Sequence, residues 1–326
     1  MVAALSSVRG QDRAVGLLLR YLETGRVPHG LLFSGEEGIG KETAALGFAA
    51  ALFCRSRSGT DACGACPDCR LLRSGSHPNF LRVSPENLSI SIDDIRLLQE
   101  ELSLKSFSDR PRVVLILPAD RMTVQAANAL LKALEEPPPE THLLLVAHRI
   151  SRLPATIVSR CQKVSFVPLP AETVERILAG LPGKGARRPQ EEIRWAAACS
   201  GGSPGRALAA LEEEDGERRE WLRLLSSFDI AAVFAQAAAW KGGGDLGPRI
   251  AAPLSLVRDA AMISSGGKEG IMNEDLSADL SSLAGRRSAG EWTRAFQELL
   301  SMSRMPPQLQ KPLMLEAFLF EFFGKD

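Results

Sequence analysis

The sequence predicts an α/β domain with a mainly parallel sheet, followed by segments that are entirely helical. Short apolar runs alternate with helical patterns as far as residue 167, and this alternation is typical of a doubly wound sheet. From Pro168 onward the strand patterns disappear and only helical periodicity continues. At 326 residues the chain is long enough for two or three domains.

Charge and hydropathy exclude several classes of protein. With 39 basic and 39 acidic residues the net charge is zero, so the chain as a whole is not an electrostatic nucleic-acid binder, although a local basic patch stays possible. No run approaches the roughly eighteen apolar residues of a membrane span, and the N-terminus lacks the order of a secretory signal. We therefore expect a cytoplasmic protein whose six cysteines do not form a disulfide framework.

Each element of the first 167 residues follows from its apolar period and its flanking residues. Amphipathic periodicity predicts a helix over 11–24, with Gly25 just past its end. Apolar runs bounded by turn residues predict strands over 30–34, 80–84, 112–117, 142–147 and 163–167. Helical patterns between them predict helices over 41–53, 92–104 and 124–136, and a helical turn that begins at Pro154.

The remainder of the chain is predicted to be helical. Three short helices are expected over 172–181, 190–200 and 203–214, and helical patterns alternate with loops over 217–323. The tryptophans of the last segment, Trp221, Trp240 and Trp292, are interpreted as core anchors.

A glycine-rich turn between the first strand and its helix has the spacing of a phosphate-binding loop. Gly35, Gly38, Gly40 and Lys41 fit the pattern G-x-x-x-x-G-K, with one additional glycine. Glycines let backbone N–H groups curl round a phosphate, and the lysine reaches the outer phosphates. These four residues are therefore the candidate nucleotide-binding residues.

Two features argue against a working magnesium site in this loop. The position after the lysine carries Glu42 instead of a Ser or Thr hydroxyl, and Thr43 is turned by about 100° along the helix. The Glu42 carboxylate could ligate Mg²⁺, but it also brings a negative charge toward a triphosphate. Asp120 lies three residues beyond the apolar run of the 112–117 strand, so we interpret it as a turn or cap residue. Whether the loop holds ATP therefore stays open.

Four closely spaced cysteines predict a structural zinc site. Cys54, Cys63, Cys66 and Cys69 have the spacing of four thiolates around a tetrahedral Zn²⁺ ion. Four protein ligands leave no open position for catalysis, so the metal would hold the fold together. A redox C-x-x-C pair and unligated thiols are the alternatives.

Taken together, the motifs resemble the bacterial sliding-clamp loader family of AAA+ proteins. The resemblance rests on Gly10 and Gln11, the phosphate loop, the four cysteines and the runs 128–138 and 153–161, and it spans about residues 8–206. It implies three parts. These are an AAA+ α/β domain over 1–167 with a zinc-binding insertion at 54–69, a small helical lid domain over 168–212, and a helical collar domain over 213–326 that oligomerises.

The resemblance also implies that this chain does not hydrolyse ATP. In the family's motor subunits the central strand ends in Asp and Glu, at positions that are Leu117 and Pro118 here. The lid arginine of the motors falls on Gly205, and Arg206 comes one position late. The implied chain is a non-hydrolysing loader subunit. The alternative within the family is an ATP-hydrolysing motor of the gamma/tau type, and a zinc-bearing nucleic-acid module is a third possibility.

Arg160 takes on a special role only through this resemblance. A lone arginine is otherwise a surface charge or a member of a salt bridge. In the family the matching arginine is a finger that reaches into the ATP site of a neighbouring motor subunit, where a planar cation stabilises charge on the γ-phosphoryl oxygens. The implied partners are gamma/tau-type motor subunits and the delta subunit. The sliding clamp and primer-template DNA would be reached through the complex, which loads the clamp during DNA replication.

Overall fold

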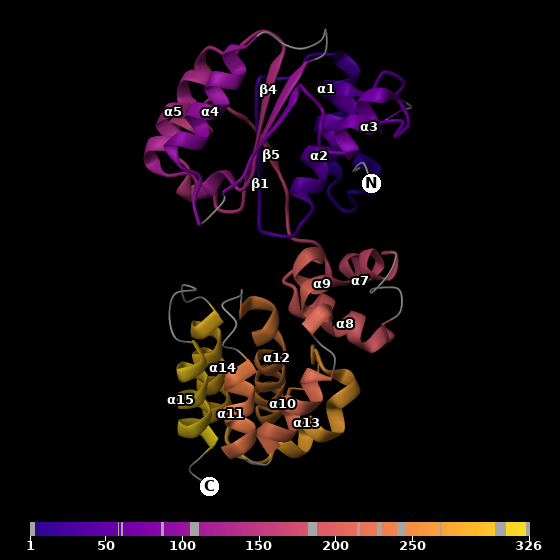
Figure 1. The fold of residues 1–326 in the computed structure, drawn as a ribbon. Coiled ribbons are helices and arrows are strands. Elements are labelled where there is room, and N and C mark those ends of the chain that lie inside the picture. Colours follow the sequence, from indigo (N-terminus) through magenta and orange to yellow (C-terminus); the bar gives the residue numbers. More distant parts are fainter. Residues whose placement is uncertain are drawn as a thin grey trace. The chain divides into compact units, whose positions relative to one another are not determined.

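The chain forms two compact units, Met1–Leu169 and Pro170–Asp326. Each is described by itself in a computed structural model (Figure 1). The residues described are 4–57, 59, 61–85, 88–104, 111–181, 188–213, 216–226, 230–239, 246–267, 269–303 and 311–323.

The first unit is built on a five-stranded parallel sheet with the strand order β2-β3-β4-β1-β5. The strands are β1 (Gly30–Ser34), β2 (Phe80–Val83), β3 (Arg112–Ile116), β4 (Thr141–Ala147) and β5 (Gln162–Ser165). In the register of the central strands Leu32 lies opposite Leu145, and Leu31 lies opposite Gln162. The predicted mainly parallel sheet is therefore confirmed.

Helices connect these strands. They are α1 (Asp12–Thr24), α2 (Lys41–Phe53), α3 (Pro67–Arg73), α4 (Ile92–Ser103), α5 (Val124–Glu135) and α6 (Ala155–Val158). Short 3-10 turns, η1 (Leu5–Ser7), η2 (Ala119–Arg121) and η3 (Ile150–Arg152), complete the unit.

The sheet is covered on both faces, which explains why its central strands are apolar throughout (Figure 1). Alternate residues of β1 serve different cores, because successive side chains of a strand point to opposite faces. Leu31 and Phe33 pack with Phe48 of α2 in one core, whereas Leu32 packs with Leu130 of α5 in the other. Helices α1 and α2 lie on one face and α4 and α5 on the other, so the sheet is doubly wound as expected.

Local signals set the ends of several helices. The hydroxyl of Ser91 accepts from the N–H of Asp94, and the Asp94 carboxylate accepts from the N–H of Ser91, which is a capping box before α4. Thr123, the residue before the predicted helix 124–136, caps α5 by accepting from the N–H of Ala126. These residues lie next to the helix they cap, and this is why sequence alone located both helix starts.

The last strand is shorter than the predicted 163–167 because a side chain continues its pairing. The Gln11 amide donates to the carbonyl of Val167 at 2.7 Å and accepts from the Val167 N–H at 3.1 Å. The same amide donates to the carbonyl of Ile39 in the glycine-rich loop, at 3.4 Å. A buried side chain thus takes the place of a further strand beside Val167 and joins it to that loop.

The second unit is helical over its described residues. Its helices are α7 (Ala171–Ala179), α8 (Gln190–Cys199), α9 (Pro204–Glu213), α10 (Glu217–Ser226), α11 (Ile230–Ala239), α12 (Leu246–Ser264), α13 (Ser277–Ala284), α14 (Ala289–Ser303) and α15 (Lys311–Phe323), with the 3-10 turn η5 (Glu274–Leu276) before α13. Trp221 and Trp292 are fully buried, which confirms their prediction as core anchors, and Trp240 lies outside the described residues. Across the part of the chain that the structure describes, none of the helices combines the length and apolar character that spanning a bilayer requires.

Candidate functional site

The glycine-rich loop lies at the carboxyl end of β1 and opens helix α2. Gly38 and Gly40 have positive φ angles of 76° and 97°, a backbone conformation that residues with a Cβ rarely adopt. At Gly35 a Cβ would come within 2.6 Å of the Phe166 carbonyl oxygen and 2.8 Å of Ile39. The loop therefore needs its glycines for the turn and for packing, whether or not a phosphate binds there.

Lys41 is buried within its own loop. Its side chain is 3% exposed, and its ammonium donates a hydrogen bond to the carbonyl of Glu36. His148, which follows β4, lies close to this ammonium. Burial, and then the positive charge of Lys41, lower the pKa of His148. Its Nδ1 is buried without a hydrogen-bond partner among the described residues. The loop thus retains its cation, but that cation already bonds to the backbone.

Glu42 is turned toward a neighbouring strand. Its carboxylate oxygen Oε1 lies 3.0 Å from Nη2 of Arg82 on β2, and both side chains are nearly half exposed. The Glu42 carboxylate, which the sequence analysis considered as a possible magnesium ligand, is thus paired with an arginine. The position that carries a Mg²⁺-binding hydroxyl in a working loop is therefore occupied here by a carboxylate that pairs with Arg82.

The end of β3 carries a structural aspartate. Asp120 is buried in η2, and its carboxylate accepts hydrogen bonds from the N–H groups of His148 at 2.8 Å and of Arg149 at 3.3 Å. The prediction that Asp120 is a turn or cap residue is therefore confirmed. Leu117, which follows β3 directly, is buried and apolar.

The four predicted cysteines converge beyond the end of α2. The sulfur atoms of Cys54, Cys63, Cys66 and Cys69 all lie within 4.8 Å of one another. Four sulfurs around a zinc ion, with bonds of about 2.3 Å, stand about 3.8 Å apart, so this set fits a tetrahedral metal after small movements. The N–H groups of Cys63 and Cys66 already donate to the sulfurs of Cys54 and Cys63, at 3.2 and 3.3 Å. The cluster is therefore compatible with a structural metal site.

The thiols of this cluster differ widely in acidity. Backbone hydrogen bonds at Ala65 and Cys66 lower the pKa of Cys63. Burial opposes ionisation of Cys66, but backbone hydrogen bonds at Arg55 and Cys69 outweigh it and lower the pKa to about 6. Burial raises the pKa of Cys69 to about 12. The thiols of Cys63 and Cys66 therefore lose their protons more readily than a free cysteine, whereas Cys69 would need a bound cation to become a thiolate.

Helix α3, which the sequence analysis did not predict, holds half of the cluster. Cys66 is its N-cap, and Pro67 occupies the first turn, where a missing N–H costs nothing. The buried Asp68 accepts from Nε of Arg55 at 2.7 Å. Arg55 therefore ties the loop after α2 to the start of α3. Pro67 and Asp68 are typical of the start of a helix, but the sequence analysis interpreted this segment only through its cysteines.

A buried histidine attaches the cysteine cluster to the sheet domain. His77 packs on Phe53 at the end of α2 with ring centroids 3.9 Å apart, and its Nδ1 accepts from the N–H of Asn79 at 3.2 Å. Burial lowers the pKa of His77, so its ring is neutral, and its Nε2 faces Asp68 at 3.8 Å. The cluster therefore rests on α2 through packed rings as well as through its own chain.

Arg160 lies at the opposite edge of the sheet from the phosphate loop. It lies between α6 and β5, and the first residue of β5, Gln162, pairs with Leu31 near the amino end of β1. The phosphate loop follows Ser34 at the carboxyl end of β1, and about 13 Å of strand separates the two edges. Arg160 therefore cannot serve the loop of its own chain.

The guanidinium of Arg160 is held by two contacts at that edge. Its Nη2 lies 2.6 Å from Oε1 of Glu135, the last residue of α5, and its Nη1 donates to the carbonyl of Thr156 at 3.2 Å. The side chains of Arg160 and Glu135 are 38% and 49% exposed, so both can be reached from solvent.

Comparison with known proteins identifies the family of this chain. A sequence model of the family described as "DNA polymerase III, delta subunit" matches residues 10–170. The DNA polymerase III subunit delta' of Yersinia pestis is 31% identical over 261 residues, which cover 77% of this chain and 75% of that protein. This chain belongs to the DNA polymerase III delta-prime family.

Other members of the delta-prime family match about half of this chain. The delta' subunit of Bacillus subtilis is 41% identical over 165 residues, covering 51% of this chain and 50% of that protein. The chain thus spans about half the length of the first curated relatives it matches. Among solved structures, a gamma subunit-related protein of DNA polymerase III from Thermotoga maritima covers 96% of this chain and 99% of its own, at 20% identity and a TM-score of 0.48.

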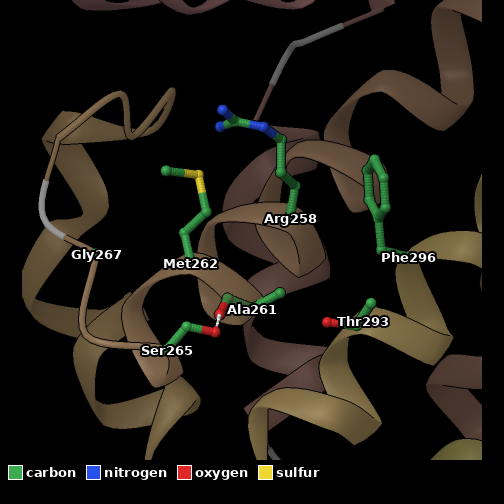
Figure 2. A pocket seen from close by; sticks show the side chains of 7 residues that line it. All are labelled: Arg258, Ala261, Met262, Ser265, Gly267, Thr293 and Phe296. Carbon is green, nitrogen blue, oxygen red and sulfur yellow. Dashed lines mark hydrogen bonds between the residues drawn. The ribbon is translucent and has the colours of Figure 1, made fainter.

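A cavity of about 360 Å³ lies elsewhere in this delta-prime family member, between α12 and α14 of the second unit. Figure 2 shows Arg258 and Met262 on α12 and Phe296 on α14, with the hydroxyl of Ser265 bonded to the carbonyl of Ala261 at 2.8 Å. The Arg258 guanidinium donates to the Asp259 carboxylate at 2.8 Å. The cavity contains none of the residues predicted as functional from sequence.

Sequence reasoning missed the partners of the predicted residues. Glu135 pairs with Arg160, Arg82 pairs with Glu42, and His148 lies beside Lys41. Glu135 stands within the run 128–138 that carried the family resemblance, so its position had been noted without its contact. No local pattern marks Arg82 or His148, because each meets its partner only through the sheet.

Proposed function

We propose that this chain is the non-hydrolysing delta-prime subunit of a bacterial clamp loader, and that it supplies Arg160 to the ATP site of a neighbouring motor subunit. In this role it helps to load the sliding clamp onto primed DNA during replication in the cytoplasm. Its partners are gamma/tau-type motor subunits and the delta subunit, and it reaches clamp and DNA through the complex.

The state of its own phosphate loop supports a subunit without ATPase activity. Lys41 bonds to the loop carbonyl of Glu36, Glu42 pairs with Arg82, and the strand that should carry acidic residues continues into Leu117. Mg²⁺ in such sites is held by a hydroxyl and an acidic side chain, and both are absent from those positions in the sequence. The glycines are explained by the turn alone.

The single observation that carries the proposal is the place of Arg160. An exposed guanidinium lies at the amino edge of the sheet, whereas the loop of its own chain lies at the carboxyl edge, and this supports contact with a nucleotide held by another subunit. A planar, permanently charged fork is suited to the γ-phosphoryl oxygens. Fingers of this kind accelerate phosphoryl transfer about 10³- to 10⁵-fold, which corresponds to roughly 4 to 7 kcal/mol of barrier.

The test is the substitution Arg160→Ala in a reconstituted loader with motor and delta subunits, sliding clamp and primed DNA. We expect hydrolysis at the neighbouring site to slow by about 10³-fold or more. Because other sites in the complex keep their own catalytic groups, the readout is the number of ATP molecules hydrolysed in the first turnover, which should decrease by one per complex.

The matched control is Arg194→Ala, which removes an exposed arginine paired with Glu274 at 3.0 Å in the second unit. It should leave the first-turnover stoichiometry unchanged. If Arg160→Ala assembles normally and hydrolyses the full number of ATP molecules, the proposed function is wrong.

The metal of the cysteine cluster is proposed to be zinc, held by Cys54, Cys63, Cys66 and Cys69. When bound, it would cross-link the end of α2 to α3, and with four protein ligands it would have no position for substrate. We expect one equivalent of zinc by elemental analysis, which Cys69→Ser should abolish. Chelation should accelerate hydrogen exchange in α3 and leave the protected strands β3 and β4 unchanged. A chain without zinc and with equally protected α3 would contradict this assignment.

The division of labour along the chain is proposed from the family. Residues 1–167 form the AAA+ domain, 168–212 the lid and 213–326 the collar that joins neighbouring subunits. Helix α15 supports a role of this segment in assembly. Its Phe320 packs edge-to-face against Phe234 of α11, and the two residues are 36% and 50% exposed.

A second candidate, an ATP-hydrolysing motor of the gamma/tau type, is favoured by one observation. Gly35, Gly40 and Lys41 keep the spacing of a working loop. The purified chain separates the two candidates. The proposed subunit shows no ATP turnover alone, whereas a motor shows turnover that Lys41→Ala abolishes. Equilibrium binding of a fluorescent ATP analogue, with and without Mg²⁺, tests whether the loop holds nucleotide at all.

A further inference from the structure

We propose that Glu135 is the resting partner of Arg160 and competes with the neighbouring subunit's nucleotide for its guanidinium. This inference rests on the proposed function of Arg160. It adds a second residue to that site and a reason for its position. Arg160 would then act on the neighbouring nucleotide only after it exchanges the Glu135 carboxylate for the phosphate.

The geometry shows a guanidinium that is already occupied. Nη2 lies 2.6 Å from the Glu135 carboxylate, and Nη1 donates to the Thr156 carbonyl. Two parallel N–H groups of the fork are what a phosphate binds best. Each terminal nitrogen carries a second N–H group, so a triphosphate competes with Glu135 for the charge of the guanidinium and for the best alignment of its N–H groups.

The charges make the displacement selective. Glu135 offers one negative charge, whereas the γ-phosphoryl group offers more charge on several oxygens, so phosphate is the better partner once it is in reach. Until then the carboxylate neutralises the arginine and keeps a like charge beside the place where the phosphate must arrive. Glu135 ends α5 and Arg160 precedes β5, so two elements that are distant in sequence set this competition.

The exposure of the pair keeps the competition weak enough to be reversed. Both side chains are more than a third exposed, and exposed pairs contribute little because water solvates the separated charges. The expected effect of removing the competing charge is therefore about two- to fivefold, where fivefold corresponds to about 1 kcal/mol.

The test is Glu135→Gln in the full reconstituted loader, which removes the charge and keeps the size of the side chain. The measured quantity is the hydrolysis equivalent that Arg160→Ala abolishes, followed as a function of ATP concentration. We expect the ATP concentration for half-maximal hydrolysis at that site to decrease about two- to fivefold, with an unchanged maximal rate. A decrease smaller than about twofold overturns the proposal, and so does a lower maximal rate, which would make Glu135 a support that aims Arg160.

Two further variants remove structural explanations. Glu136→Gln makes the same change of charge one residue along the chain at another exposed position, and should not shift the ATP dependence. In an Arg160→Ala background, Glu135→Gln should leave the ATP dependence of the remaining hydrolysis unchanged, because the two residues then no longer share an interaction. A shift in either variant overturns the proposal.

The outcomes separate this inference from the proposed function. If Arg160→Ala removes no hydrolysis, the finger itself is wrong. If Arg160→Ala removes one equivalent and Glu135→Gln leaves its ATP dependence unchanged, the finger stands and the competition is wrong.

Discussion

The two units satisfy their buried polar groups in different ways. In the sheet unit, buried charges bond mainly to the backbone. Arg112 donates to the carbonyls of Glu101, Leu102 and Leu104 at the C-terminal end of α4, at 3.3, 2.8 and 2.8 Å. Asp120 likewise accepts from two N–H groups after β4.

In the helical unit, buried polar side chains bond to one another and to a connecting loop. Asp259 of α12 is fully buried and accepts from the N–H and the side-chain amide of Asn273, both at 2.8 Å. Asn273 in turn accepts from Arg218 of α10, which also pairs with Asp275 at 3.0 Å and lies over the ring of Trp195, 4.8 Å from its centroid. We call these five residues the polar network of the second unit.

The difference follows from how the two kinds of element are joined. Strands are cross-linked by a backbone ladder, so side chains need only satisfy the ends of helices and turns. Helices satisfy their backbone internally, and nothing in the backbone holds one helix against another. Directional side-chain bonds supply that orientation in the second unit, and they connect α8, α10, α12 and the loop before η5.

The largest expected effect is the loss of Asp259. Asp259→Ala leaves Asn273 and Arg258 without their buried acceptor, and we expect a loss of about 3–5 kcal/mol in the free energy of unfolding of the second unit. All four tryptophans lie in that unit, so denaturant unfolding followed by tryptophan fluorescence reports on it selectively. The exposed Asp279→Ala is the control.

Asp259→Ala also tests the proposed boundary between lid and collar. Because the network joins Trp195 to residues beyond 213, hydrogen exchange should accelerate in α8 together with α12. Faster exchange in α12 alone would show that the two segments unfold separately and that the network does not unite them.

A smaller loss is expected in the sheet unit from Arg112→Leu. Three carbonyls at the C-terminal end of α4 lose a charged donor, and we expect about 2–3 kcal/mol less stability in the first unit. Hydrogen exchange in β3 and α4 measures the effect, and Arg96→Leu on the exposed face of α4 serves for comparison. An effect as small as that of Arg96→Leu would mean that water satisfies these carbonyls equally well.

Acidification should weaken only the first unit. All four histidines lie there, and burial lowers the pKa of His142 and of His148. A folded-state pKa below the unfolded value of about 6.5 means that the unfolded chain binds more protons. The contribution of these histidines to stability is therefore complete above about pH 6.5 and decreases as pH falls, by at most about 1.4 kcal/mol per pH unit for each histidine.

Hydrogen exchange of the strands at pH 7.5 and 5.5, corrected for intrinsic rates, measures this effect, and tryptophan fluorescence should show an unchanged second unit over the same range. His142→Gln separates the histidine from the cysteine cluster, since His142 bonds to the carbonyl of Pro28 and not to a thiol. If this variant keeps the full pH dependence, His142 is not among its causes.

The smallest effect is expected at the exposed ion pair of the phosphate loop. Glu42→Gln should change the stability of the first unit by less than about 1 kcal/mol, because solvent screens the pair with Arg82. Denaturant unfolding followed by circular dichroism is sufficient for this comparison. A larger loss would show that Glu42 holds the loop in place, and not merely that it stands where a magnesium-binding hydroxyl would be.

Local chemistry determined much of this protein from its sequence. The apolar runs of β1 and β3, the cap Thr123 and the glycines of the phosphate loop each act on residues a few positions away, so their patterns predicted strands, a helix start and a turn. The parallel sheet and the helical second half are confirmed for the same reason. Helix α3 was missed although Pro67 and Asp68 marked its start, because the segment around them was interpreted only through its cysteines, as a metal site.

The tertiary structure alone decided which groups meet. Arg160 and Glu135, Glu42 and Arg82, and Asp259 and Asn273 are each separated by 14 residues or more, and no periodicity connects them. Their contacts depend on strand order and helix packing, which arise from burial summed over a whole unit. Sequence could therefore name Arg160 and Glu42 as chemically unusual, but only the folded chain shows the partner that holds each of them.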